Sequence, residues 1–425
     1  MLKDAQKLAY DMALQGKNLF ITGGAGVGKS YTIREIIKAL QNKGRNIMVT
    51  APTGIAALNI DGVTVHRAFK VPLRPLISKM KSIPGELKAL EVLIMDEVSM
   101  CRIDLFDYVA TIIIHLNIWR RSLGLPDVQV ILIGDFFQLP PVIKDDDRKI
   151  LEIKYGNNLK QGFAFQSNLW KQFNFVNIIL TETVRQSDNT FIKALNMARV
   201  GDNRCLRYIE ANASMTPIEN AIILCSTNKE VKDRNTEELN KLKTREQIYE
   251  ASITGEVNQS DKVVDDVIRL RIGARVMTAI NDPEDAYRNG SLGTVTGLTD
   301  TAVEVRLDAG GTVTITRNTW DILGYSTEHK KDKKTGKDET TLTTNVIGTF
   351  SQIPLKLAYA VTIHKSQGQT YDAVNLNPYC WDYGQLYVAL SRAKKVDTIH
   401  LITPLKWNYL KASPDVIRFY NSISK

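Results

Sequence analysis

The sequence predicts an α/β protein whose first half is a parallel sheet. Short apolar segments at residues 18–23, 47–50, 92–95 and 128–133 each end in glycine or polar residues. Between them lie stretches with helical spacing, as in the isoleucines and leucine of residues 33–40. Apolar strands that alternate with amphipathic helices are typical of parallel sheets covered by helices. Ligands of such sheets bind beyond the carboxyl ends of the strands, which is where the polar residues of this half gather.

The second half predicts another parallel sheet with a different module inserted into it. Further strands are expected at 221–225, 357–363, 374–376 and 398–403. Residues 268–322 instead alternate apolar and polar side chains and contain glycine turns. A period of two with such turns predicts a small antiparallel barrel. The charged stretch that follows, residues 329–341, is predicted to be a solvated loop.

Composition restricts the class of protein. The 425 residues carry 55 Lys and Arg against 46 Asp and Glu, a net charge of +9, which admits a polyanionic partner without proving one. The four cysteines are scattered, so we expect reduced thiols rather than disulfides or a zinc site. The sequence shows neither a secretory signal nor an apolar stretch of membrane-spanning length. We therefore expect no membrane partner and a cytoplasmic protein of a bacterium or phage.

Residues 23–30 (GGAGVGKS) predict a nucleotide site, because they fit GxxxxGK[ST] between a strand and a helix. Glycines allow backbone N–H groups to surround phosphate oxygens at a helix N-terminus. In this pattern Lys29 reaches the β- and γ-phosphates of ATP and Ser30 holds Mg²⁺. The nucleotide-binding residues expected at this loop are Gly23, Gly24, Ala25, Gly26, Val27, Gly28, Lys29, Ser30 and Tyr31.

Two acidic residues after the third strand predict that the bound nucleotide is hydrolysed. Asp96 is expected to bind Mg²⁺ and Glu97 to polarise the attacking water. Gln138 follows the next strand and is interpreted as a sensor of the γ-phosphate, with a polar turn before a proline as the ordinary alternative. Arg185 and Arg392 are candidate arginine fingers, although a solvated arginine and a helix-capping arginine are the ordinary alternatives.

The order of these motifs resembles superfamily 1 DNA helicases of the B branch, and most of all the Pif-type (petite integration frequency) family, with RecD and Dda more distant. Gln6 matches the residue that reads adenine, and the resemblance adds Gln6 and Gly368 to the expected nucleotide-binding residues. The matching segments are 23–30 for motif I, 51–54 (APTG) for Ia, 64–69 (TVHRAF) for Ib, 96–100 (DEVSM) for II, 134–141 for III, 183–186 (TVRQ) for IV, 362–368 (TIHKSQG) for V and 384–392 for VI. The segment from 99 to about 121 occupies the place of the family signature, but residues 111–127 fit that pattern only loosely.

The resemblance implies an ATP-driven motor that moves 5′-to-3′ on single-stranded DNA and unwinds forked or partial-duplex DNA. G-quadruplexes are a further partner that this family admits, and a monomer suffices because one chain completes the ATP site. The implied DNA-binding residues are Pro52, Thr53, Gly54, His66, Phe69, Thr362, His364 and Lys365. Threonine and lysine suit phosphates, while the aromatic side chains suit bases or sugars.

The same resemblance gives the domain organisation. It implies two RecA-like parallel-sheet domains with a small SH3-like β-barrel inserted in the second. We expect the first domain at 1–184, with a strand-separating wedge at 70–88. The second domain is expected at 185–267 and 346–425, with the barrel and charged loop at 268–345. The basic residues of the wedge are Lys70, Arg74, Lys79, Lys81 and Lys88, each of which is also compatible with a solvated loop.

Three other functions share some of these features. A P-loop ATPase that moves proteins shares motifs I and II, but it does not explain the HKSQG and ALSRA segments. A helicase–nuclease needs a carboxylate cluster, and residues 145–147 (DDD) form the dense acidic run near a motif, which we interpret as a solvated turn. A non-enzymatic nucleotide switch does not explain Glu97 and the candidate arginine fingers.

Overall fold

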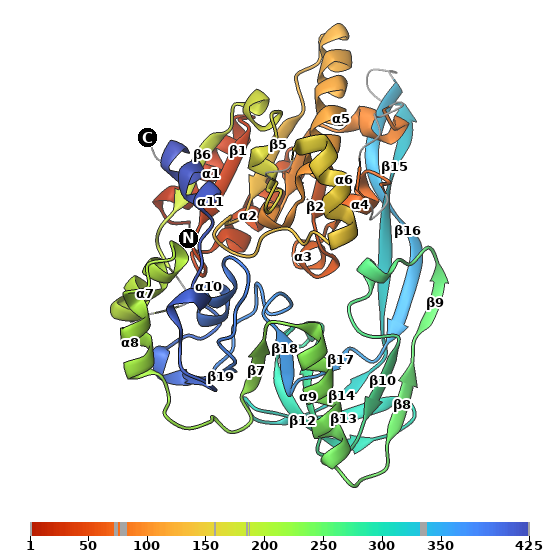
Figure 1. The fold of residues 1–425 in the computed structure, drawn as a ribbon. Coiled ribbons are helices and arrows are strands. Elements are labelled where there is room, and N and C mark those ends of the chain that lie inside the picture. Colours follow the sequence, from red (N-terminus) through yellow and green to blue (C-terminus); the bar gives the residue numbers. More distant parts are fainter. Residues whose placement is uncertain are drawn as a thin grey trace. The chain divides into compact units, whose positions relative to one another are not determined.

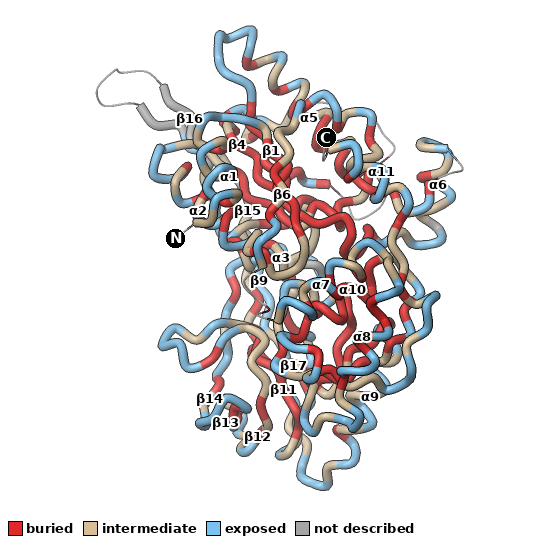
Figure 2. Tube along the Cα trace, turned by 90° about the vertical axis from the view of Figure 1, so that its left-hand side faces the viewer, coloured by how far each residue is buried: buried red, intermediate tan, exposed pale blue. Residues whose placement is uncertain are grey.

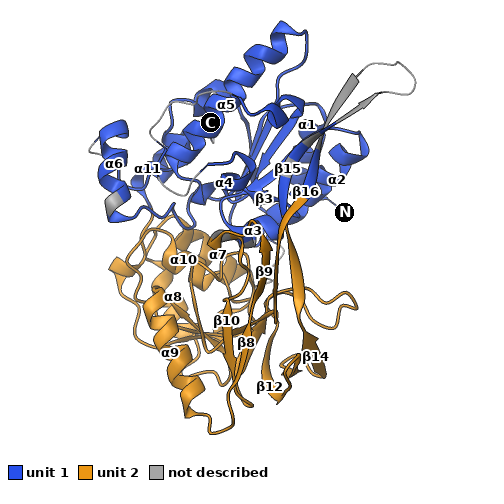
Figure 3. Ribbon diagram, turned by 90° about the vertical axis from the view of Figure 1, so that its right-hand side faces the viewer, with its two compact units in different colours: residues 1–185, 323–345, 413–425 blue, residues 186–322, 346–412 orange. Residues whose placement is uncertain are grey.

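The computed structural model describes residues 2–71, 75–76, 83–156, 159–183, 186, 188–331 and 338–423. The chain divides into two compact units, coloured separately in Figure 3. The first comprises residues 1–185, 323–345 and 413–425, and the second comprises 186–322 and 346–412. In the described part of the chain, none of the helices has the length and apolar composition needed to cross a membrane.

The first unit is built on a parallel six-stranded sheet in the order β3-β2-β4-β5-β1-β6. Four of these strands coincide with the predicted ones, which confirms the parallel sheet. β3 and β6 were not predicted. The strands are β1 (Leu19–Gly23), β2 (Ile47–Ala51), β3 (Val63–Thr64), β4 (Val92–Met95), β5 (Gln129–Ile133) and β6 (Val176–Leu180).

Helices bury the apolar surface of this sheet. In α2, the side chains of Ile33, Ile36, Ile37 and Leu40 are all buried, as their helical spacing predicted. Figure 2 shows the strands of the first sheet as an almost continuous buried layer. The helices of this unit are α1 (Asp4–Leu14), α2 (Lys29–Asn42), α3 (Gly54–Leu58), α4 (Val65–Ala68), α5 (Ile103–Ser122), α6 (Asp145–Tyr155) and α11 (Pro414–Ile423). Short 3₁₀ turns are η1 (Gly85–Ala89), η2 (Val98–Met100), η3 (Ala164–Gln166) and η4 (Trp170–Phe173).

The last helix, α11, belongs to the first unit although it closes the chain. Figure 1 shows this helix near β1, which it contacts through Phe419 and Phe20. The ring of Phe419 stacks on Phe165 with centroids 4.3 Å apart and also contacts Phe20 and Trp170. The sequence pattern had grouped residues 346–425 in the second domain. The assignment differs at 413–423 because α11 buries its aromatic side chains in the first unit.

The second unit contains a parallel four-stranded sheet in the order β18-β7-β19-β20. The strands predicted at 221–225, 374–376 and 398–403 are all present in it. Its elements are α7 (Asn189–Arg199), α8 (Cys205–Asn212), β7 (Ile222–Cys225), α9 (Asn228–Lys241), β18 (Ala360–Thr362), β19 (Val374–Leu376), α10 (Gln385–Leu390) and β20 (Ile399–Leu401), with 3₁₀ turns η6 (Val396–Thr398) and η7 (Trp407–Tyr409).

An antiparallel module interrupts this sheet, as predicted, but it is larger than residues 268–322. A five-stranded sheet has the order β14-β13-β12-β11-β17, β10 pairs with β8, and a third sheet has the order β15-β16-β9. The apolar run 357–363 is therefore divided between β17 and β18. The strands are β8 (Gln247–Glu250), β9 (Ser252–Gly255), β10 (Val267–Leu270), β11 (Arg275–Thr278), β12 (Leu292–Leu298), β13 (Ala302–Leu307), β14 (Thr312–Thr316), β15 (Asn318–Lys331), β16 (Asp338–Gln352) and β17 (Leu355–Leu357), and η5 spans Gln259–Asp261.

Two charged stretches differ from their predicted structure. The stretch 329–341, predicted as a loop, is strand at residues 329–331 and 338–341, while 332–337 lie outside the described residues. Strand pairing uses backbone hydrogen bonds, which hydropathy does not register. The acidic run 145–147, predicted as a solvated turn, is the first turn of α6. Acidic side chains at that position favour a helix because they complement its dipole.

Candidate functional site

The loop between β1 and α2 has the geometry of a phosphate cradle. Gly26 and Gly28 have φ of 79° and 82°, the left-handed region that favours glycine. A Cβ on Gly23 would lie 2.3 Å from the Leu180 carbonyl oxygen, so that position excludes any side chain. The N-cap of α2 is Gly28, which has no side chain to cap the helix, and the backbone N–H groups of a helix N-terminus favour an anion.

Lys29, the first residue of α2, turns back over this loop. Its Nζ donates hydrogen bonds to the carbonyl oxygens of Gly23 and Gly24 at 2.8 and 2.9 Å. The ammonium group therefore lies within the cradle, where the motif predicts its contact with phosphate. Ser30 follows it in the first turn of α2.

Asp96 and Glu97 follow β4 at the same edge of the sheet. β5 alone separates β4 from β1, and neighbouring strands lie about 4.8 Å apart, so the ends of β1 and β4 are about 10 Å apart. Burial raises the pKa of Asp96 to about 7, the adjacent Glu97 adds to this rise, and Lys29 opposes it. A buried carboxylate of this kind is stabilised by a cation, so Asp96 and Ser30 fit the Mg²⁺ site that the sequence predicted.

Glu97 has a φ of 49°, which is uncommon for a residue other than glycine. A backbone held in this region costs on the order of 1–3 kcal/mol and tends to occur at functional sites. The strain places Glu97 at the turn between β4 and η2, immediately after the candidate metal ligand.

Gln138 lies in the turn after β5, and its side chain is buried. Its Nε2 donates to Asp135 Oδ2 at 3.4 Å, and its backbone N–H donates to the Asp135 carbonyl at 2.9 Å. The structure therefore brings the phosphate loop, Asp96, Glu97 and Gln138 to the carboxyl edge formed by β1, β4 and β5.

The other predicted nucleotide residues of this unit lie around the same loop. Gln6 of α1 donates its side-chain amide to the Val27 carbonyl at 3.3 Å and accepts the Lys3 N–H at 3.0 Å. Tyr31, two residues into α2, is 45% exposed. The side chain that was predicted to read adenine therefore adjoins the phosphate loop.

The predicted DNA-binding residues of the first unit follow β2 and β3. Thr53 stands between Pro52 and Gly54, the first residue of α3. Its hydroxyl accepts the Ala56 N–H at 3.3 Å. Burial lowers the pKa of His66, and nearby Arg102 lowers it further. Phe69 was predicted to lie against bases, but it is 1% exposed, so its ring is part of the core in this structure. An apolar ring of this size favours burial over exposure to water.

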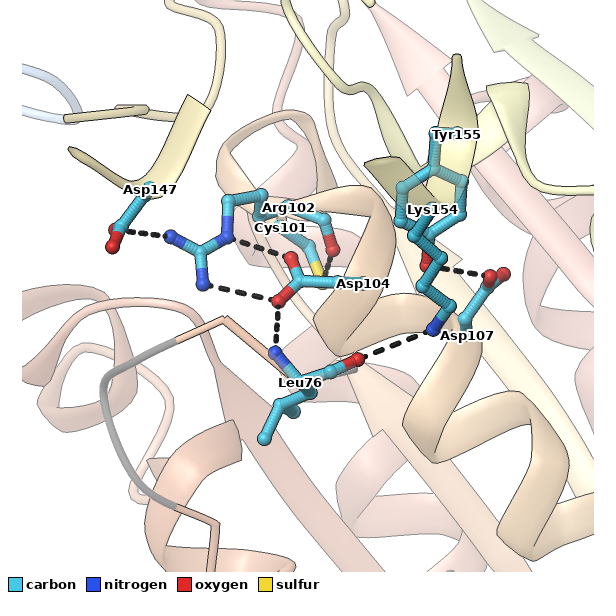
Figure 4. A network of polar contacts seen from close by, with 8 residues as sticks. All are labelled: Leu76, Cys101, Arg102, Asp104, Asp107, Asp147, Lys154 and Tyr155. Atoms are coloured by element: carbon cyan, nitrogen blue, oxygen red, sulfur yellow. Dashed lines mark hydrogen bonds and ion pairs between the residues drawn. The ribbon is translucent and has the colours of Figure 1, made fainter. Parts of the chain in front are cut away.

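A polar network beside motif II was not predicted (Figure 4). Asp104 of α5 is fully buried and accepts hydrogen bonds from Arg102 Nε at 2.6 Å, Arg102 Nη2 at 3.0 Å and the Leu76 N–H at 2.8 Å. Arg102 also donates to Asp147 at 2.9 Å, and Lys154 donates to the Leu76 carbonyl at 3.1 Å. Both backbone polar groups of Leu76 are therefore held by side chains of α5 and α6.

Leu76 belongs to the predicted wedge, of which the structure describes only a part. Arg74, Lys79 and Lys81 lie outside the described residues. Lys70 pairs with Glu86, and the Lys88 ammonium lies 5.5 Å from the centre of the Trp119 ring. These two lysines therefore make contacts within the first unit.

In the second unit, the segment after β18 repeats the arrangement seen after β2. The Thr362 hydroxyl accepts the Lys365 N–H at 3.2 Å, just as Thr53 caps α3. Burial lowers the pKa of His364. Gly368 has a φ of 81°, and a Cβ there would meet no atom within 4 Å.

Arg392, predicted as an arginine finger, is 1% exposed and makes hydrogen bonds within the second unit. Its guanidinium donates to the carbonyl oxygens of Val388, Ser366 and Gln369 at 2.8, 3.1 and 2.9 Å. It therefore joins motifs V and VI. Gln186, the last residue of motif IV, donates to the Ala393 carbonyl at 3.1 Å. The other predicted finger, Arg185, lies outside the described residues.

The comparisons with known proteins agree with this arrangement of motifs. The PIF1-like helicase family matches residues 1–203, and the UvrD-like helicase C-terminal domain matches residues 357–396. The chain is 30% identical to the ATP-dependent DNA helicase Pif1 of Campylobacter jejuni, over 97% of this chain and 95% of that protein.

Solved structures show the same fold. The crystal structure of Bacteroides sp Pif1 in complex with ADP-AlF4 is 30% identical, has a TM-score of 0.82, and covers 100% of this chain and 97% of that one. The Bacteroides Pif1 helicase in complex with ADP-AlF3 and ssDNA is 31% identical, has a TM-score of 0.69 and covers the same shares of the two chains. With one relative 30% identical over almost its entire length and this agreement in fold, the chain belongs to the Pif1 helicase family.

Proposed function

We propose that the chain is a Mg²⁺- and ATP-dependent helicase that moves 5′-to-3′ along single-stranded DNA and separates forked or partial-duplex DNA. The observation that carries this proposal is the convergence of Lys29, Asp96, Glu97 and Gln138 on one sheet edge beside the phosphate loop. Family membership supports DNA as the track.

The first unit supplies the groups that hydrolysis requires. Backbone N–H groups at the start of α2 and the Lys29 ammonium bind the phosphates, and Ser30 and Asp96 hold the metal ion. When bound, Mg²⁺ neutralises charge on the β- and γ-phosphates. Glu97 orients and deprotonates the attacking water, while Gln138 contacts the γ-phosphate and reports its presence to motif III.

In this proposal two arginine side chains stabilise the transition state of hydrolysis. Arg185 and Arg392 are the candidates, and an arginine finger is worth about 10³–10⁵ in rate. Arg392 is engaged by carbonyl oxygens of its own unit in this structure, so its proposed catalytic contact requires it to exchange some of these partners for phosphate. Alternation between the two sets of contacts is a means of coupling ATP turnover to motifs V and VI.

The DNA track is proposed to use matching threonines on the two units. Thr362 ends β18 and Thr53 shortly follows β2, and each hydroxyl caps the turn that follows. Hydroxyl and backbone N–H groups at such positions can bind phosphates without reading bases. His364 and Lys365 directly follow Thr362 in the chain, whereas His66 lies in α4, after β3. The segment 70–88, held at Leu76, is the proposed wedge, and a monomer is the proposed active form.

ATP hydrolysis with and without single-stranded DNA tests the core of this proposal. We expect DNA to stimulate turnover. We expect Lys29→Ala to abolish turnover while it leaves DNA binding largely intact, since the Lys29 ammonium is held at the phosphate loop. An ATP hydrolysis rate that is the same with and without DNA would contradict the helicase function and favour an ATPase that acts on another substrate.

Strand displacement tests direction. The assay compares two partial duplexes of identical sequence, one with a 5′ tail and one with a 3′ tail. We expect strand displacement only from the 5′-tailed duplex. Unwinding of the 3′-tailed duplex alone would overturn the proposed polarity but not the ATPase. A blunt duplex and the Lys29→Ala variant serve as controls.

A further inference from the structure

A tyrosine from the last helix reaches the region between the phosphate loop and motif III. Tyr420 lies on α11, is 7% exposed, and packs its ring on Phe137 with centroids 4.7 Å apart. Its hydroxyl lies 2.5 Å from the hydroxyl of Thr22, the β1 residue that immediately precedes Gly23. The motifs of the family do not include this residue.

The same hydroxyl contacts two residues that precede Gln138. It lies 3.3 Å from the Phe136 backbone nitrogen, whose N–H it accepts, and it donates to Asp135 Oδ1 at 3.3 Å. A tyrosine hydroxyl has one proton and two lone pairs. Donation to Asp135, with acceptance from Phe136 and Thr22, uses all of this capacity, so the hydroxyl is a specific three-way link rather than an incidental contact.

Asp135 carries this link to the candidate γ-phosphate sensor. Its carboxylate is fully buried, and while Oδ1 accepts from Tyr420, Oδ2 accepts from Gln138 Nε2 at 3.4 Å. The path from Tyr420 through Asp135 to Gln138 is thus made of buried polar contacts within the first unit. In a buried setting such contacts are strong, and losing one member changes the orientation of the next.

We propose that Tyr420 is a positioning residue for ATP hydrolysis, which fixes Gln138 relative to the phosphate loop through Asp135 and Thr22. This inference rests on the proposed function, because it assumes that Gln138 senses the γ-phosphate. Tyr420 itself touches no substrate. Its removal therefore affects turnover, while the affinity for ADP, which lacks the γ-phosphate, stays the same.

The test is Tyr420→Phe, which removes one oxygen atom and keeps the ring. We expect kcat for DNA-stimulated ATP hydrolysis to fall about tenfold, as for other groups that orient a site from outside it, with KM for ATP and the Kd for ADP within a factor of two. Tyr208→Phe is the matched control, since the Tyr208 hydroxyl also donates to an aspartate, at 3.2 Å, but in the second unit. Its kinetics should match the unaltered protein.

A double-mutant cycle distinguishes positioning from a general structural effect. In a Gln138→Ala background, Tyr420→Phe should lower kcat less than twofold further, because the group it positions is gone. A full tenfold loss in that background, or an unchanged kcat in the single variant, overturns the proposal. Thermal unfolding shows whether each variant is folded.

Thr22→Val provides a second route to the same link if Tyr420→Phe does not fold. Valine keeps the shape of threonine and removes only the hydroxyl that meets Tyr420 on the strand side. We expect about a threefold loss in kcat and no change in KM, and an unchanged kcat in the folded variant contradicts the proposal. The unaltered protein is assayed first. If the unaltered protein lacks DNA-stimulated turnover, the proposed function and this inference are refuted together. If its turnover is normal and the substitutions leave kcat unchanged, the inference alone is refuted.

Discussion

Removing the carboxylate of Asp104 should both destabilise the first unit and uncouple strand separation from ATP turnover. This side chain is fully buried and accepts three hydrogen bonds, two from Arg102 and one from the Leu76 backbone. Arg102 is itself only 13% exposed, so Asp104→Ala leaves a buried guanidinium without its principal partner. Breaking a buried pair in this way costs about 3–5 kcal/mol.

Urea unfolding measures that loss, and Asp127→Ala is the matched control. Asp127 also pairs with an arginine, Arg121, but the two side chains are 41% and 66% exposed. An exposed pair contributes about 0–1 kcal/mol, so the control should unfold almost as the unaltered protein does. Equal destabilisation by the two substitutions would refute the distinction drawn from burial.

The functional readout is the ratio of unwinding to ATP hydrolysis. Asp104 holds Leu76 of the proposed wedge, so unwinding should fall several-fold. DNA-stimulated hydrolysis should be largely retained at a temperature where the variant is folded. Parallel losses of unwinding and hydrolysis would mean that the network supports the ATP site rather than the wedge.

Three further substitutions or conditions give sharp outcomes. Glu97→Gln should bind ATP but slow its cleavage at least about 100-fold in single-turnover assays, and brisk hydrolysis would remove Glu97 from its assigned role. Arg392→Ala should destabilise the second unit by about 3 kcal/mol in urea, because two buried carbonyl groups and one partly buried carbonyl group lose their donor. A variant that is as stable as the unaltered protein would show that the guanidinium is not structural. The pKa values of His66 and His364 are lowered in the folded protein, so the unfolded chain binds more protons near pH 6.5. Folding stability should therefore be lost as pH falls through that value, by up to about 1.4 kcal/mol per pH unit for each histidine. Replacement of His364 by Gln should reduce the slope of stability against pH.

The parts of the site that sequence predicted are those encoded by neighbouring residues. The phosphate loop lies between a strand and a helix within residues 19–42, and Asp96 and Glu97 directly follow their strand. Strand order then brings these segments to one edge without any further information in the side chains. Local pattern and parallel topology together were sufficient for this part.

The contacts that sequence missed join residues that are distant in the chain. Thr22 and Tyr420 are 398 residues apart, and nothing near either residue indicates their pairing. Arg392 was interpreted from its motif alone. Two of its partners, Ser366 and Gln369, lie in a turn more than twenty residues earlier in the chain, and its guanidinium is buried against them. Asp147 was predicted to lie in a solvated turn because a run of charged residues is usually exposed to water. Its carboxylate instead pairs with Arg102 at 2.9 Å. Polar side chains with buried partners are the ones that composition cannot place.

The position of α11 has a consequence for how the protein is made. The first unit contains Phe419 in its aromatic cluster, so this core cannot close until nearly the entire polypeptide has left the ribosome. At roughly 5–20 residues per second, synthesis of residues 186–419 takes on the order of 10–50 s. Throughout that time the rings of Phe20, Phe165 and Trp170 lack their final partner. The nascent N-terminal half is therefore a natural client for chaperones that recognise exposed aromatic surface.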